Sequence, residues 1–276
     1  MRNLKPILER LYKTYDFKGR VEHDPIKFPR LYKDEKDIEA AGFIASSLAY
    51  GKVELFMPVV EKILRPMGKS PYEFLRGFKP RKHGRLFTGI RYRFQKEEDI
   101  IGILYVLSKI LNKYSMIYYL FKVNYNGNDK DIGHGLTGII NNILSTDLSE
   151  VYGKDIKTKG LMQLFPSPAN GSPCKRANLY LRWMVRDRDI DFGIWKDIPK
   201  SKLVIPLDTH IKRVSRCLGL TSRKTADWKM AVEITESLKR FDPDDPLKYD
   251  FALCHRGIAG ICKERNCGGC ELREPA

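Results

Sequence analysis

Long apolar stretches are absent from this chain, and none of its segments is apolar enough to span a bilayer. Residues Met1 to Lys5 also lack the apolar run of a signal peptide. We find no internal repeat and no low-complexity tract. The lack of a long apolar stretch excludes a membrane-spanning segment. Together with the lack of a signal-peptide run, it leads us to expect no membrane partner and a cytoplasmic location.

Acidic residues are scarce relative to basic ones. The chain has 34 Asp and Glu against 50 Lys and Arg, which gives a formal net charge of +16 and a pI near 9.5. Such a surplus suits a polyanionic partner and predicts salt-sensitive affinity that depends little on sequence. A generally lysine-rich proteome would account for part of the excess. With 42% hydrophobic residues in 276, the chain can bury a full core, as one domain or as two closely packed lobes.

The alternation of apolar and polar residues that marks a strand is almost absent. Only residues 85–94 alternate in a way that predicts a short strand. Elsewhere the apolar residues recur at helical spacing, most clearly Ile100, Ile103, Leu104, Leu107 and Leu111. We therefore predict an all-α protein, with helices over residues 4–15, 35–50, 53–64, 97–112, 114–123, 132–144, 173–186, 209–218, 225–241 and 247–259.

Two short motifs combine an amine with a carboxylate. The first is Asn170-Gly171-Ser172-Pro173-Cys174-Lys175-Arg176-Ala177-Asn178, which follows a Pro- and Ser-containing turn at 166–171. Ser172 and Pro173 predict a helix start, with Ser172 as the N-cap and Pro173 at the first helical position. The second motif is Pro206-Leu207-Asp208-Thr209-His210, and Asp208 has the position of an N-cap for the following helix.

The chemistry of this pair follows from the residue types. A lysine can act as a nucleophile, and a carboxylate fixed at a helix start can take its proton or stabilise a cationic sugar. On spacing alone, the pattern favours an ordinary solvated lysine on a basic helix for Lys175. Asp208 is also explained as a cap with no further role.

Together the motifs resemble the helix-hairpin-helix-GPD superfamily of DNA glycosylases, which includes endonuclease III and the 8-oxoguanine glycosylases. The hairpin of that superfamily reads roughly L-P-G-V-G-x-K-T-A-N and is followed by V-D-T-H. Lys175 falls on the superfamily's Schiff-base lysine and Asp208 on its catalytic aspartate. The whole chain looks like one branch of the superfamily, marked by Leu48-Ala49-Tyr50-Gly51 and by the turn at Asp208.

The resemblance implies a single glycosylase-like unit over residues 1–276, with two helical lobes and a cleft between them. One lobe would span 36–187 and carry the hairpin, and the other would join 1–35 to 188–276. Lys175 and Asp208 would face each other across the cleft, where a flipped nucleotide could enter. The implied DNA contacts are Asn170, Gly171 and Ser172 of the hairpin, Tyr50 and Lys52 in a region similar to the strand-inserting loop, and Lys212. Tyr50 and Lys52 are equally explained as a core tyrosine and a surface lysine.

The chain departs from the superfamily pattern at two places. Pro173 replaces the second glycine of the hairpin, which removes one backbone donor. Residues 187–205 separate lysine from aspartate more widely than in endonuclease III, a spacing that resembles some archaeal 8-oxoguanine glycosylases. Phe192 and Trp195 in this segment are candidates for an aromatic stacking surface, or else core residues.

The function implied is base-excision repair: a DNA glycosylase with AP lyase activity, acting as a monomer on double-stranded DNA that contains a damaged base. An oxidised base such as 8-oxoguanine is the expected lesion. The alternative is a non-catalytic DNA-binding module that keeps the hairpin and the basic surface.

Four cysteines lie near the C-terminus: Cys254, Cys262, Cys267 and Cys270. Endonuclease III ends in a four-cysteine loop that holds a 4Fe-4S cluster, and the last three of these cysteines resemble its first three ligands. The fourth ligand would fall at Ala276, so Cys254 would have to complete a site for an iron–sulfur cluster or zinc. Unmetallated thiols, with no cofactor, and a structural disulfide are the other interpretations.

Overall fold

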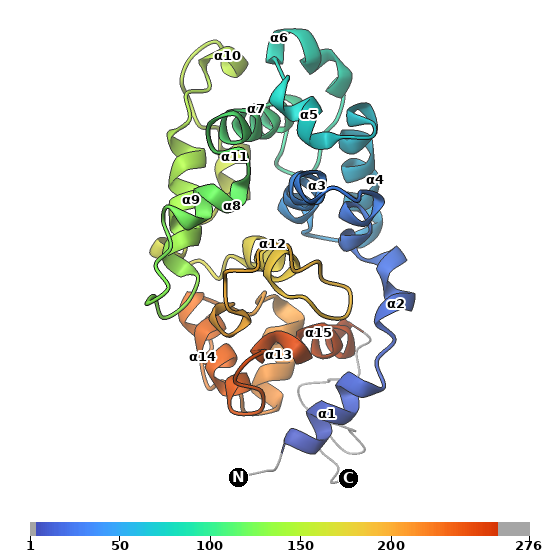
Figure 1. Cartoon of the computed structure of the whole chain (residues 1–276), viewed down its shortest axis with the longest axis vertical. Helices are drawn as coiled ribbons and strands as arrows, with labels where there is room; N and C mark the ends of the chain where they lie inside the picture. Colours follow the sequence, from blue (N-terminus) through green and yellow to red (C-terminus); the bar gives the residue numbers. More distant parts are fainter. Residues whose placement is uncertain (1–3, 259–276) are drawn as a thin grey trace.

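The computed structural model describes residues 4–258, and it is built from helices (Figure 1). No strand occurs within this range, where the sole ladder pairing is an isolated bridge between Tyr92 and Gln95. The expectation of an all-α protein is confirmed. The expected strand at 85–94 is wrong, because Gly84–Phe87 forms a 3-10 turn and residues 92–95 close a tight turn on themselves.

The predicted helices all have counterparts, with ends that differ by a few residues. Five short helices were not predicted: α2, α5, α6, α10 and α11. The α-helices are α1 (Lys5–Lys13), α2 (Phe17–Arg20), α3 (Glu35–Leu48), α4 (Val53–Leu64), α5 (Pro71–Arg76), α6 (Pro80–His83), α7 (Glu97–Tyr114), α8 (Ile117–Lys122), α9 (Gly133–Ser145), α10 (Ser149–Tyr152), α11 (Lys159–Leu164), α12 (Lys175–Val185), α13 (Thr209–Cys217), α14 (Trp228–Lys239) and α15 (Asp250–Ile258). Short 3-10 turns join several of them, including Pro168–Asn170 before α12 and Pro246–Tyr249 before α15.

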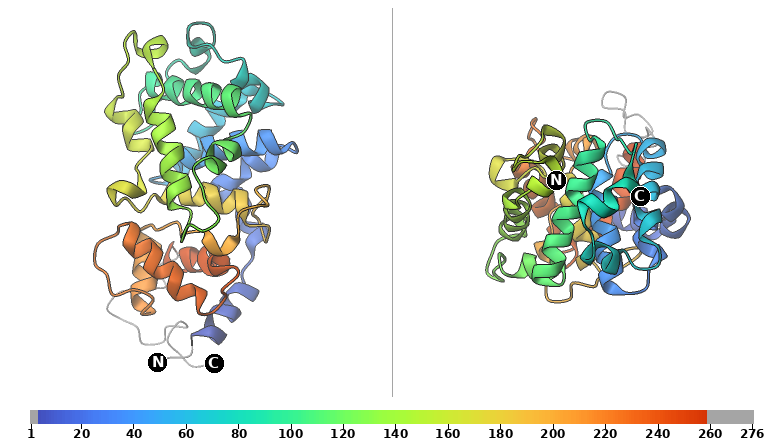
Figure 2. Two further views of the ribbon diagram at one scale, coloured as in Figure 1. Left: turned by 60° about the vertical axis from the view of Figure 1, so that its left-hand side comes forward. Right: turned by 90° about the horizontal axis from the view of Figure 1, so that it is seen from above.

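Helix α12 lies at the centre of the molecule. Helices α3 to α11 gather on one side of it, and α13, α14, α15 and α1 lie on the other (Figures 1 and 2). Its apolar face packs on α3, where the rings of Phe43 and Tyr180 are 5.4 Å apart. Its polar face is buried as well, since Asn178 is fully buried and Arg182 nearly so. A helix enclosed in this way fixes the position of any residue at its first turn.

Buried ion pairs hold α12 to the elements that follow it. Arg182 contacts Asp191 at 3.3 Å and Asp250 at 2.6 Å. Arg186 contacts Asp191 at 3.0 Å and Asp245 at 2.9 Å. Removing one member of such a network leaves a buried charge without its partner, which typically costs several kcal/mol. The network therefore orders the connection that runs from α12 to α13.

The aromatic residues of that connection are structural. Trp195 is 1% exposed and its indole Nε1 donates to Glu39 Oε1 at 2.9 Å, so of the two interpretations the core residue is confirmed for Trp195 and the stacking surface is wrong. Phe192 is half-buried beneath the guanidinium of Arg30, at 5.4 Å. Glu39 also accepts the amides of Ile117 and Tyr118, and its burial raises its pKa to about 7.

Helices α13 and α15 pack closely against each other. A Cβ atom on Gly257 would lie 2.7 Å from the Cβ of His210, so the contact requires glycine at this position. The side chain of Arg213 donates to the carbonyl of Gly257. Among the described residues, no helix is both long and apolar enough to cross a bilayer.

Candidate functional site

Lys175 is the first residue of α12. The helix is preceded by Cys174 in a left-handed conformation, with φ 47°, and this cysteine is the N-cap. The expected cap at Ser172, with Pro173 inside the helix, is therefore wrong. Ser172 instead accepts the amide of Cys174 through its Oγ at 3.3 Å, which closes a turn before the helix begins. The Nζ of Lys175 donates to the carbonyl of Ala49, at the end of α3, at 3.3 Å.

Asp208 caps α13, as predicted. Its Oδ1 accepts the amides of His210 at 2.9 Å and Ile211 at 2.8 Å. The two bonds fix the carboxylate and leave Oδ2 pointing elsewhere. The thiol of Cys254 donates to this second oxygen, with Sγ 3.6 Å from Oδ2.

The charges of Lys175 and Asp208 both act on the thiol of Cys254. Burial raises the pKa of the Cys254 thiol well above its ordinary value, and the carboxylates of Asp208 and Asp250 raise it further. The charge of Lys175 acts in the opposite direction on the same thiol. The thiol of α15 thus contacts the carboxylate at the start of α13 and is also within the electrostatic influence of the amine at the start of α12. The motifs predicted the first two, but no local pattern links Cys254 to Asp208 across 46 residues.

Asp250 is the other carboxylate near Cys254, and it is engaged by Arg182. Burial raises its pKa to about 6, while Arg182 opposes that shift. Because Asp250 is buried and paired, Asp208 is the carboxylate of this group with an oxygen available for chemistry.

Tyr50 lies beside the first turn of α12. Its ring faces the guanidinium of Arg176 at 4.8 Å and that of Arg93 at 5.6 Å. Arg176 also donates to the carbonyl of Ser47 at 3.0 Å, and burial lowers its pKa to about 10. Tyr50 is half-buried, whereas Lys52, two residues on, is exposed at the start of α4.

The hairpin turn before α12 is exposed at its tip. Asn170 and Gly171 are exposed and Ser172 is half-buried. Gly171 has φ 75°, and a Cβ there would meet nothing within 4 Å, so the backbone conformation alone favours glycine. Its carbonyl accepts the amide of Trp228 at 2.9 Å, which ties the turn to α14. Lys212 is half-buried on α13, one turn after Asp208.

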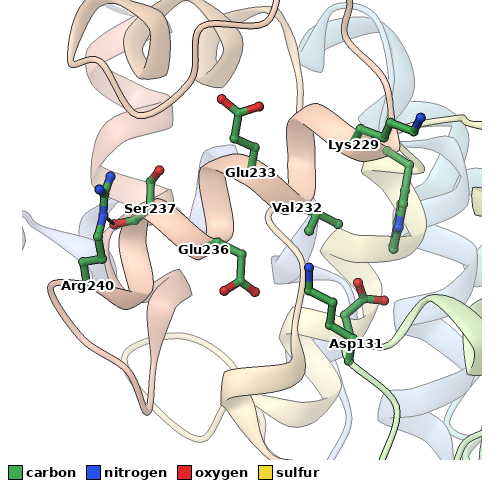
Figure 3. A pocket seen from close by; sticks show the side chains of 9 residues that line it. Asp131, Lys229, Val232, Glu233, Glu236, Ser237 and Arg240 are labelled. Atoms are coloured by element: carbon green, nitrogen blue, oxygen red, sulfur yellow. Dashed lines mark hydrogen bonds between the residues drawn. The ribbon is translucent and has the colours of Figure 1, made fainter.

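A hollow of about 650 Å³ lies elsewhere, between α14 and the loop at Lys130 and Asp131 (Figure 3). Acidic and basic side chains line it in equal number, among them Glu233, Glu236 and Arg240. It includes neither Lys175 nor Asp208. A smaller hollow of about 380 Å³ shares Asp131 with it and reaches the hairpin turn at Pro168 and Ala169.

Of the four cysteines considered for a metal, only Cys254 lies among the described residues, and Cys262, Cys267 and Cys270 lie outside them. Between residues 4 and 258 no group of three or more His, Cys, Asp or Glu side chains could hold a metal ion. Cys174 is buried, which raises the pKa of its thiol to about 12, and its Sγ donates to the carbonyl of Pro166 at 3.1 Å.

The chain belongs to the family DUF2400, described as a protein of unknown function, whose model matches residues 24–259. Comparisons with curated proteins and with solved structures gave no match to the chain.

Proposed function

We propose that this member of the DUF2400 family is a DNA glycosylase with AP lyase activity, of the helix-hairpin-helix-GPD type. The observation that carries the proposal is that Lys175 and Asp208, which the motifs assign to nucleophile and carboxylate, are 33 positions apart and yet both act on Cys254, Asp208 by direct contact and Lys175 through its charge. The proposed substrate is a damaged base in double-stranded DNA, and an oxidised purine such as 8-oxoguanine is the first lesion to test.

The proposed reaction uses few groups. The Nζ of Lys175 attacks C1′ of the damaged nucleoside, the bond from C1′ to the base breaks, and Oδ2 of Asp208 takes a proton from the amine and passes it to the departing base. Ring opening gives an imine between Lys175 and the sugar. Loss of a proton from C2′ then expels the 3′ phosphate and cleaves the strand.

Two lobes separated by a cleft form part of this proposal. One would comprise residues 36–187 and the other residues 1–35 with 188–276, as in the superfamily that the motifs resemble. The central position of α12 between two groups of helices supports this division (Figure 1). The flipped nucleotide would enter beside the first turn of α12, with the exposed tip at Asn170 and Gly171 next to the DNA backbone.

Borohydride trapping tests the mechanism, because only an imine intermediate is reduced to a stable protein–DNA adduct. Duplexes carrying single lesions, with 8-oxoguanine first, should give an adduct with the wild-type chain and none with Lys175→Gln. Lys62→Gln is the matched control, since it removes one exposed lysine of α4 that has no assigned contact with DNA. Equal trapping by Lys175→Gln and the control would exclude Lys175 as the nucleophile.

One contact favours a second function. The Nζ of Lys175 is already bound to the carbonyl of Ala49, so the lysine also fits a structural role at the end of α3. A non-catalytic DNA-binding module would use it in that way. Such a module binds duplex DNA with no adduct on any lesion, and Lys175→Gln would then lower the melting temperature.

A further inference from the structure

The basic charge of the chain is concentrated in one segment, residues 76–96, which we call the basic segment. It contains eight Lys or Arg residues and no Asp or Glu, so it carries half of the formal net charge of +16. All eight residues are exposed: Arg76, Lys79, Arg81, Lys82, Arg85, Arg91, Arg93 and Lys96. None of the eight forms an ion pair with an acidic side chain in the described part of the chain.

The backbone of the basic segment is anchored from within. Phe78 and Phe87 are buried, with ring centroids 6.0 Å apart, and Phe74 packs against both. At the other end Tyr92 and Gln95 are buried and bind each other through their backbones at 3.0 and 2.9 Å. The cations are therefore presented by an ordered surface and not by a free loop.

The cations also lie near one another. Burial lowers the pKa of His83, and the charges of Lys82, Lys79 and Arg85 lower it further, in that order. Several like charges around one side chain repel each other in the absence of a counterion. A surface of this kind is stabilised by a polyanion.

The basic segment leads to the candidate site. Arg93, at the tip of the turn at 92–95, faces the ring of Tyr50, and Arg176 faces the same ring. Arg176 is adjacent to Lys175 in α12. From this point the segment runs back towards α5 and α6, at the end of the molecule remote from α1 (Figure 1).

We propose that the basic segment is a second contact surface for the phosphate backbone of duplex DNA, extending the footprint from Lys175 towards α6. The choice of DNA as the polyanion rests on the proposed function, because one end of the segment adjoins the proposed nucleotide site. Contacts to phosphates fix the position of a protein on the duplex without reading its sequence. The surface should therefore act equally on undamaged DNA.

The test compares two triple variants with the same loss of charge. Arg81→Gln, Lys82→Gln and Arg85→Gln together neutralise the α6 end of the segment. Lys5→Gln, Lys13→Gln and Lys18→Gln together neutralise three exposed lysines of α1 and α2, away from it (Figure 1). Binding of an undamaged duplex of roughly 20 base pairs is measured by fluorescence anisotropy between 50 and 200 mM salt, a range over which phosphate contacts change affinity by orders of magnitude.

The α6 triple variant should bind at least about tenfold more weakly than wild type. The slope of its log affinity against log salt concentration should be smaller in magnitude by about two to three. The control variant should stay within about twofold. Equal losses in the two variants would mean that only net charge matters, and unchanged binding in the α6 variant would exclude the surface. Vesicles of phosphatidylserine are the second probe: binding to them that depends on the α6 residues, with duplex binding unaffected, would assign the surface to anionic lipid instead.

These outcomes are separable from the fate of the proposed function. At saturating lesion duplex the α6 variant should still form the Lys175 adduct, because it keeps the nucleophile. If the wild-type chain forms no adduct and the α6 variant binds duplex DNA more weakly than wild type, the contact surface is supported and the proposed glycosylase activity is refuted. If the wild-type chain forms the adduct and the α6 variant binds duplex DNA as tightly as wild type, the glycosylase activity is supported and the contact surface is refuted.

Discussion

We propose two roles for Asp208, one for each of its carboxylate oxygens. Oδ1 caps α13, and Oδ2 is the oxygen assigned to proton transfer. Asp208→Asn should preserve the cap, because asparagine caps as well as aspartate, but lose the charge. We expect imine formation to slow by about 100-fold or more while the melting temperature stays nearly constant. Rapid trapping by this variant would leave Asp208 with a structural role only.

Cys254 is expected to position that carboxylate, since its thiol donates to Oδ2. Cys254→Ala should slow trapping about three- to tenfold, in keeping with one modest hydrogen bond, and Cys254→Ser should restore most of the rate because the hydroxyl can donate in the same place. Cys217→Ala, on α13, is the control. Loss of iron or zinc from anaerobically purified Cys254→Ala protein would instead assign this cysteine to a metal site with Cys262, Cys267 and Cys270.

At the scale of elements, the approach of α15 to α13 sets the distance between Cys254 and Asp208. Gly257→Ala would place a Cβ 2.7 Å from the Cβ of His210 and 3.2 Å from its Cα, so α15 must shift. We expect a loss of roughly 1–3 kcal/mol in the free energy of unfolding, measured by urea denaturation. Gly127→Ala, where a Cβ would meet nothing within 4 Å, should change little. Similar stabilities for the two variants would contradict the close packing.

The helices and their connections differ in how far the sequence predicts them. The bounds of α7 agree with the prediction to within two residues, because apolar residues recur at helical spacing along one face of this long helix. The strand at 85–94 was wrong because the alternation there reflects Phe87, Ile90 and Tyr92 anchoring turns in the core. The start of α12 was displaced by two residues because Cys174 adopts a left-handed conformation that no propensity predicts. The position of Asp208 followed from local capping, whereas its contact with Cys254 depends on the packing of two helices.

At the scale of the whole molecule, Glu39 joins α3, α8 and the connection that carries Trp195. Its pKa is about 7 in the folded chain, raised from an ordinary value of 4.5 by burial. A raised carboxylate pKa means that the folded state binds the proton more tightly, so the contribution to stability is present below pH 4.5 and is lost as the pH rises through 7. Burial raises the pKa of Asp250 in the same direction.

Stability should therefore fall between pH 5 and pH 8, with roughly 2–3 kcal/mol coming from Glu39. Urea denaturation of wild type and Glu39→Gln at both pH values measures this contribution. The variant should be less stable at pH 5, because an amide cannot accept all three donors, and its dependence on pH should be weaker. An unchanged dependence on pH in Glu39→Gln would show that Glu39 does not titrate in this range.

Lys175 is the residue that the proposed reaction joins to DNA. The most direct measurement is peptide mapping by mass spectrometry of the borohydride-trapped adduct, formed on a duplex with a single damaged base. We predict that the sugar remnant lies on Lys175 and on no other lysine. An adduct on a different residue, or no adduct on any lesion while the chain still binds duplex DNA, would contradict it.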